Sequence, residues 1–213
     1  MGRNAQRMRW VTNLCLAGLL IFSVDESGAK EPKQPVAGPL ITLYAPHREQ
    51  YEVVLDTIEL QWPMSDKGGV PAVDTPVMVY GARVVDSEAS RAVVALSEIT
   101  TLADLSAMTA ALKAVNPGVD IYPVLFESGL PHSKSTRRLL TREVGLLVEE
   151  GIDVQDLVAG LAVRSVRSIP GVPGGYVVDA SDPIATLTLA EALRERPGVR
   201  SAYPLLKRAY VAR

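Results

Sequence analysis

The side chains that most often carry nucleophilic or metal chemistry are scarce in this sequence. Its 213 residues include two histidines, His47 and His132, and one cysteine, Cys15. Both histidines lie in predicted loops with no cysteine or carboxylate at ligand spacing. A His/Cys metal cage therefore cannot be assembled, and a serine-type triad would have only two possible bases. We expect surface histidines, no bound metal, no cofactor and no catalytic activity of this chain.

The acidic and glycine-rich clusters have structural interpretations. Ser97-Glu98 and residues 179–182 each precede a predicted helix, where they can accept hydrogen bonds from free backbone N–H groups. The glycines at 171–175 lack the G-K-[ST] signature of a phosphate loop and are expected in a turn. Asn116 is the one asparagine outside the first thirty residues and ends a predicted helix, which disfavours an acylphosphatase-like hydrolase.

Composition excludes other classes of function. Lys plus Arg number 22 and Asp plus Glu 24, so the net charge is −2, and the basic surface that nucleic-acid binding requires is absent. Hydrophobic residues make up 47% and aromatic residues 5%, which indicates a core of Val, Leu, Ile and Ala. The length allows one ordinary domain or two small ones.

The N-terminus has the organisation of a secretory signal peptide, residues 1–29. Three arginines precede an apolar run at 10–24, and Ser27-Gly28-Ala29 follows as a cleavage site, with cleavage expected after Ala29. The run is shorter than the roughly 20 residues of a membrane-spanning helix, so export is favoured over a stable membrane anchor. The mature protein would be secreted or periplasmic and, without Cys15, would contain no disulfide.

The rest of the chain divides into segments of different pattern. Residues 30–39 contain three prolines and read as a flexible leader. Residues 40–126 predict a small α+β module, with a helix at 101–115 that ends at Asn116-Pro117-Gly118. Residues 127–142 are polar and basic, and we expect a linker that is solvated or meets an acidic partner. The strands of the module are expected at 40–44, 51–62, 77–85, 91–96 and 119–126, and the linker carries Lys134, Arg137, Arg138 and Arg142.

Residues 143–206 predict the order β-α-β-β-α-β. That order is typical of an α+β, ferredoxin-like sandwich, in which two helices cover one face of an antiparallel sheet. Ser181 or Asp182 would cap the second helix, and Pro197-Gly198 would end it. The strands are expected at 143–149, 163–169, 175–179 and 199–203, and the first helix at 153–161.

Three short sequence motifs of the first module recur in the second module. Ala111-Leu112-Lys113, Pro117-Gly118-Val119 and the run from Tyr122 correspond to residues 192–194, 197–199 and the run from Tyr203, at offsets of 80 or 81 residues. Either a small α+β unit is duplicated, or helix, Pro-Gly turn and strand form a common local solution.

The C-terminal stretch from Leu139 to Leu206 resembles the pro-domain of secreted bacterial subtilisin-like serine proteases. The resemblance covers about a third of the chain, and the order and spacing of its parts are more specific than any single part. The matching runs are 140–151, 166–171, 175–178, 190–193 and 197–204.

The resemblance implies a folding aid and inhibitor of a subtilisin-like protease, with a C-terminal tail that lies in the substrate cleft by strand addition. Pro204 departs from that pattern because it cannot donate an amide hydrogen bond. Lys207 and Arg208, at the start of a tail over residues 207–213, are either a processing site or a solvated chain end. The residues placed in the cleft by position are Ala202, Tyr203, Pro204, Leu205 and Leu206.

No catalytic domain is present in this sequence. The protease is therefore expected either in trans or in a longer gene product, with the chain being a fragment of that product. The alternative is a non-catalytic secreted module with a ferredoxin-like fold that binds a protein or small ligand.

Overall fold

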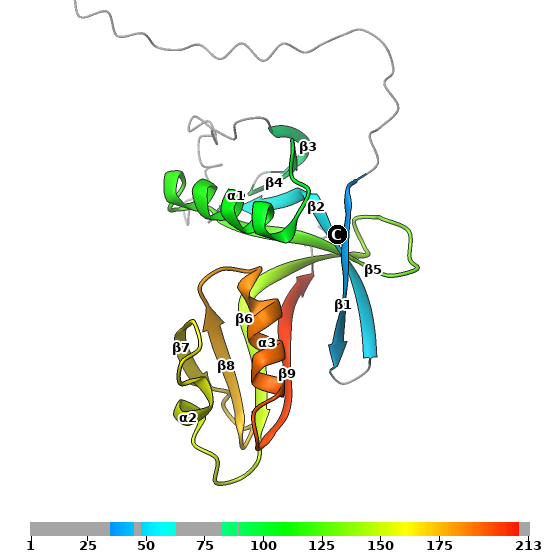
Figure 1. Ribbon diagram of the computed structural model, residues 1–213. Coiled ribbons are helices and arrows are strands. Elements are labelled where there is room, and N and C mark those ends of the chain that lie inside the picture. Colours follow the sequence, from blue (N-terminus) through cyan, green and yellow to red (C-terminus); the bar gives the residue numbers. More distant parts are fainter. Residues whose placement is uncertain (1–34, 45–47, 63–81, 89, 209–213) are drawn as a thin grey trace, which may run out of the picture. The chain divides into compact units, whose positions relative to one another are not determined.

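The computed structural model describes residues 35–44, 48–62, 82–88 and 90–208, which form nine strands and three helices (Figure 1). The signal peptide, its cleavage site Ala29, most of the leader and His47 lie outside the described residues. Among the described residues, no helix has the length and apolarity needed to cross a membrane. The elements are β1 Ala37–Tyr44, β2 Arg48–Gln61, β3 Ala82–Glu88, β4 Arg91–Leu96, α1 Leu102–Val115, β5 Asp120–Glu127, β6 Arg137–Val148, α2 Val154–Val158, β7 Val163–Ser168, β8 Gly175–Ala180, α3 Ala185–Arg194 and β9 Val199–Arg208.

All nine strands join one antiparallel sheet, so the chain has a broadly α+β fold. The strand order is β3-β4-β2-β5-β6-β8-β7, with β1 paired to β2 and β9 paired to β6. The hairpin β5–β6 connects the two halves of the sheet through residues 124–126 and 137–139. Residues 34–213 form one compact unit.

The two halves of the sheet repeat one arrangement. We call residues 48–127 the N-terminal repeat, with strand order β5-β2-β4-β3, and residues 137–208 the C-terminal repeat, with order β9-β6-β8-β7. In both repeats every pair is antiparallel, and a helix precedes the strand that pairs with the first, α1 before β5 and α3 before β9. This shared order supports duplication of one α+β unit.

The helices α1 and α3 correspond residue by residue. Thr101 Oγ1 accepts a hydrogen bond from the Asp104 amide, and Asp182, 81 residues later, accepts from the equivalent Ala185 amide. Thr101 and Asp104 complete a capping box, which fixes the start of α1. Each helix buries a leucine at the equivalent place near its C-terminal end, Leu112 in α1 and Leu193 in α3. The correspondence therefore includes caps and core positions.

A proline and a strand irregularity recur at the same place in both repeats. Pro123 of β5 pairs with Ile58, and Pro204 of β9 pairs with Val144. Directly beside each pair, the longer strand shifts register, between Val54 and Ile58 in β2 and between Leu140 and Val144 in β6. Because proline has no N–H to donate to a ladder, an irregularity beside it is physically expected.

Two apolar cores lie between the helices and the sheet. Leu105 and Leu112 of α1 pack with Ile58 and Leu60 of β2 in the first. In the second, residues of α2 and α3 pack on β6 and β8, and Figure 1 shows α3 lying over β6 and β9. A smaller cluster of Val54, Val124, Phe126 and Leu139 lies at the junction of the repeats.

Many element bounds agree with the sequence patterns, and the largest differences occur at the expected leader and linker. The strand expected at 77–85 is β3, Ala82–Glu88, and residues 77–81 lie outside the described residues. Residues 37–39, placed in the leader, begin β1, and residues 137–142, placed in the basic linker, form the first half of β6. The linker prediction is wrong over 137–142 because β5 and β9 supply hydrogen-bonding partners from distant parts of the chain. The predicted helix 153–161 is shorter, at Val154–Val158, and the last strand extends from Val199 to Arg208.

Candidate functional site

The residues predicted to fill a protease cleft lie inside the sheet. Tyr203 and Pro204 of β9 pair with Gly145 and Val144 of β6, and Ala202 is fully buried. Residues 202–206, which the resemblance places in a protease cleft, pair with β6 in this structure, because β6 begins at Arg137 and gives β9 a pairing partner as far as Arg208. Of the predicted tail over 207–213, residues 209–213 lie outside the described residues.

The possible processing pair Lys207-Arg208 also belongs to β9. Both side chains are exposed, but their backbone pairs with Leu139 and Arg138 of β6. The Lys207 ammonium donates a hydrogen bond of 2.6 Å to the Gln61 side-chain oxygen and lies 5.1 Å from the centre of the Tyr122 ring. A protease would have to separate β9 from β6 to cleave here.

The C-terminal repeat has one sheet face that carries no described helix. Val177, Gly145 and Tyr203 form a row across β8, β6 and β9 on the face opposite to α3. Leu147 and Leu205 lie two residues along from Gly145 and Tyr203 and are half-buried. None of these four apolar side chains belongs to the buried clusters among the described residues. We call this set the open face.

Gly145 allows the open face to be flat. A Cβ atom at this position would lie 3.1 Å from Leu205 Cδ2 and 3.2 Å from the Tyr203 ring, so these side chains would have to shift by a few tenths of an ångström. The two side chains therefore lie across Gly145 and make a continuous apolar surface. A flat apolar sheet surface is suited to contact with another protein.

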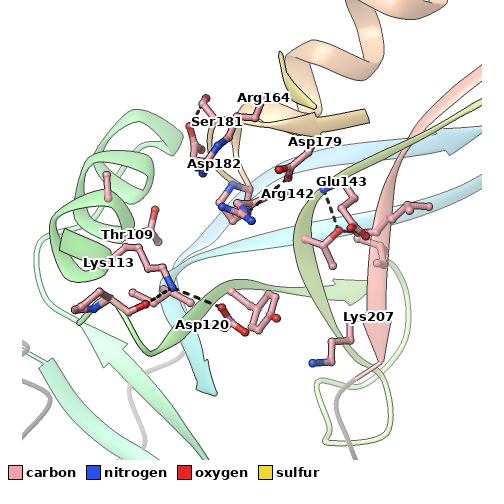
Figure 2. A pocket seen from close by; sticks show the side chains of 18 of the residues that line it. Thr109, Lys113, Asp120, Arg142, Glu143, Arg164, Asp179, Ser181, Asp182 and Lys207 are labelled. Atoms are coloured by element: carbon pink, nitrogen blue, oxygen red, sulfur yellow. Dashed lines mark hydrogen bonds and ion pairs between the residues drawn. The ribbon is translucent and has the colours of Figure 1, made fainter. Parts of the chain in front are cut away.

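A cleft of about 1130 Å³ separates the two repeats (Figure 2). One wall comes from α1 and the start of β5, with Lys113, Asp120 and Tyr122. The other comes from β7 and the turn before α3, with Arg164 and Asp182. The floor is the irregular part of β6, where Thr141 donates a 2.8 Å hydrogen bond to the Leu205 carbonyl and accepts one from the Glu143 amide.

The carboxylates of the cleft already have partners. Asp179 pairs with Arg142 at 3.7 Å, and Asp120 with Lys113 at 3.6 Å. Glu143 binds Arg167, and Asp182 accepts from the Ile184 and Ala185 amides. Within the described residues, Arg164 pairs with no carboxylate and Lys207 bonds only to the neutral Gln61 side chain. The lining has five cations (Lys113, Arg142, Arg164, Arg167 and Lys207) and four carboxylates (Asp120, Glu143, Asp179 and Asp182), so its net charge is +1.

A buried ion network lies on the face of the N-terminal repeat opposite to α1, around Glu59 of β2. Glu59 is fully buried, and its carboxylate lies 3.1 Å from the Arg137 guanidinium and 4.0 Å from that of Arg91. The Gln61 side-chain amide donates a 2.7 Å hydrogen bond to Glu59 Oε1, the oxygen that faces Arg91. Arg91 also binds Glu88 at 2.6 Å. The network joins β2, β4 and β6 through charges that water does not reach.

The network extends to the β5–β6 loop through Lys134, which binds both Asp86 and Glu88 of β3. The basic residues expected to be solvated are therefore largely paired: Lys134 and Arg137 here, and Arg142 with Asp179. The alternation of Ile58, Glu59 and Leu60 in a predicted strand indicates that Glu59 lies on the opposite face, but nothing local indicates its arginine partners.

Glu88 makes the network sensitive to acid. Hydrogen bonds from Arg91 and then Lys134 lower its pKa from 4.5 to about 2. The Glu88 contribution to stability is therefore complete above about pH 4.5 and is lost as the pH falls towards 2. We expect Glu88→Gln to flatten the fall in melting temperature over this pH range. Equal slopes for the variant and the parent would contradict the assignment.

The remaining predicted site residues have structural contacts. His132 stacks on Phe126 with ring centroids 4.1 Å apart and lies 3.9 Å from Glu52. Asn116 is buried at the end of α1 and its side-chain amide donates to the Leu112 carbonyl. Among the described residues, no group of three His, Cys, Asp or Glu side chains is placed to hold a metal ion.

Comparisons with protein-family models, with curated proteins and with solved structures found no match for this chain.

Proposed function

We propose that this chain is a secreted, non-catalytic protein that docks on a subtilisin-like serine protease and aids its folding or inhibits it, in trans or as part of a longer product. The observation that carries the proposal is the open face of the C-terminal repeat, an apolar sheet surface centred on Gly145. The sequence resemblance to subtilase pro-domains falls on this same segment.

The strand order supports the finer fold assignment that the proposal needs. The C-terminal repeat runs β6-α2-β7-β8-α3-β9, and its sheet has the order β9-β6-β8-β7 with every pair antiparallel. Residues of α2 and α3 share one core against that sheet. We therefore assign it a ferredoxin-like sandwich.

The mode of docking that we propose differs from strand addition by residues 202–206. Those residues already pair with β6 along one edge of β9, so strand addition to a protease cleft would have only the other edge of β9. Contact through the open face leaves β9 in place and requires that Leu147, Tyr203 and Leu205, which are half-buried, lose their remaining exposure to water, whereas Val177 is already buried.

The test is inhibition of purified bacterial subtilisins by residues 30–213, followed with a chromogenic peptide substrate. We expect slow-binding inhibition by the parent chain. Leu147→Glu should weaken it by about tenfold or more, because a carboxylate would be desolvated in the contact. Gln155→Glu, which adds the same charge on the exposed side of α2, is the matched control and should inhibit like the parent.

Two results would contradict the proposal. Absence of inhibition by the folded parent chain across the panel would remove the protease as partner. Equal inhibition by Leu147→Glu and the parent, with equal melting temperatures, would show that the open face makes no contact with the protease.

A second function, binding of a peptide or small ligand by a non-catalytic module, is favoured by the cleft between the repeats. Its volume of about 1130 Å³ is slightly larger than that of ordinary small-ligand sites, which leaves room for a peptide.

A further inference from the structure

The wall of the cleft includes a strand edge without a strand partner. β5 pairs with β2 along its whole length, from Asp120 to Glu127. On its other side β5 pairs with β6 only at residues 124–126. The edge at 120–123 therefore has no strand beside it among the described residues, and Asp120, Ile121 and Tyr122 line the cleft.

The neighbouring part of the same β5 edge already pairs with an antiparallel strand of this chain. β6 lies against β5 as an antiparallel strand at residues 137–139, and beyond Leu140 it changes register and turns towards β8. The unpaired edge begins where β6 departs. An added antiparallel strand would continue the line that β6 starts and would use backbone groups that have no other strand to bond.

The charges around this edge indicate the chemistry of the added strand. Each carboxylate that lines the cleft already has a cation or two backbone amides as partner. Arg164, on β7 at the opposite wall, has no partner within the described residues, and Lys207 has only a neutral acceptor and the Tyr122 ring. Figure 2 shows Arg164 and Lys207 at different ends of the site. A ligand that carries carboxylates along its length would meet a cation at both ends.

We propose that the cleft between the repeats binds an extended acidic peptide segment, which adds to the edge of β5 at residues 120–123 as an antiparallel strand and places carboxylates towards Arg164 and Lys207. Main-chain hydrogen bonds supply the affinity, and the two cations select acidic over basic sequences. This site shares Leu205 with the open face, but the peptide is held at β5 and the proposal does not depend on the protease.

The experiment uses residues 30–213 and a short fluorescent peptide of alternating glutamate and valine, with binding measured by fluorescence anisotropy. Two peptides serve as comparisons: one with lysine in place of glutamate, and one with alternate backbone nitrogens methylated. We expect the lysine peptide to bind at least about tenfold more weakly, and the methylated peptide to lose binding because it cannot form the ladder.

Variants of the protein test the charge and the place of binding. Arg164→Glu should weaken the glutamate peptide by about tenfold, whereas Arg200→Glu, on an exposed part of β9 outside the cleft lining, should leave the affinity unchanged. Hydrogen exchange should slow when the peptide is bound at the one amide of Ile121 and Tyr122 that faces the unpaired edge, while the other, which faces β2, should not change. No binding of the glutamate peptide at millimolar concentration, equal binding of the glutamate and lysine peptides, full binding of the methylated peptide, or an unchanged affinity of Arg164→Glu would each overturn the proposal.

Discussion

Replacement of Glu59 by alanine is expected to lower the free energy of unfolding by about 3 to 5 kcal/mol, because it leaves buried guanidinium groups without their central partner. Glu59 is fully buried, and Arg91 and Arg137 are 4% and 7% exposed. Water cannot replace the lost carboxylate without opening the sheet face. The measurement is urea unfolding of residues 30–213 at neutral pH.

The matched control is Glu191→Ala, which removes an exposed pair with Arg194 at 3.9 Å. An exposed pair of this kind contributes at most about 1 kcal/mol, and alanine is a good helix former. If Glu59→Ala costs no more than Glu191→Ala, the buried network does not stabilise the fold.

The two equivalent leucines are expected to give the second large effect. Leu112→Ala and Leu193→Ala should each lower the free energy of unfolding by about 2 to 5 kcal/mol, since both side chains are almost fully buried in their cores. Because one sheet runs through both repeats, each substitution should shift a single unfolding transition. Urea unfolding of both variants is compared with that of the parent.

Trp62 provides a local probe for this comparison. It is the one tryptophan after Trp10, and it packs against the core of the N-terminal repeat. We expect Leu193→Ala, in the other core, to shift the Trp62 fluorescence transition as far as the far-ultraviolet circular dichroism transition. An unshifted Trp62 transition would show that the repeats unfold separately. Val115→Ala, at a 66% exposed site on α1, is the control and should change stability little.

Local signals were sufficient to predict most elements. The strand at Arg91–Leu96 was expected with the bounds that the structure has, and the helix expected at 101–115 is α1. Caps and Pro-Gly stops act over a few residues, so they can be recognised in the sequence alone. The β-α-β-β-α-β order of the C-terminal repeat was predicted for the same reason.

The strand at residues 137–142 and the pairing of residues 202–206 depend on contacts between distant parts of the chain, which the sequence does not indicate. Arg137 and Arg138 are typical of a solvated linker, and only the contact of Arg137 with Glu59, 78 residues away, makes a buried strand position favourable. The pairing of residues 202–206 could not be predicted for a related reason, since it depends on where β6 begins.

The cleft could not be predicted either, because it forms where β6 leaves β5 and turns to β8. Its residues come from six elements that are separated along the chain and from the turns beside them, and nothing in the sequence around Arg164 or Lys207 indicates a ligand site. The two surfaces that carry our proposals, the open face and the cleft, thus required the three-dimensional arrangement.

The contact at the junction between the repeats determines how further copies of the unit could be added during evolution. β1 lies beside the first part of β2 as β5 lies beside the first part of β6, with Ile41 opposite Tyr51 and Phe126 opposite Arg137. Each copy of the unit therefore receives, on its longest strand, the strand that comes just before it in the chain. A gene that acquired a further copy would need no new kind of contact at the seam, so selection could lengthen this architecture by whole units and leave each existing surface free to specialise.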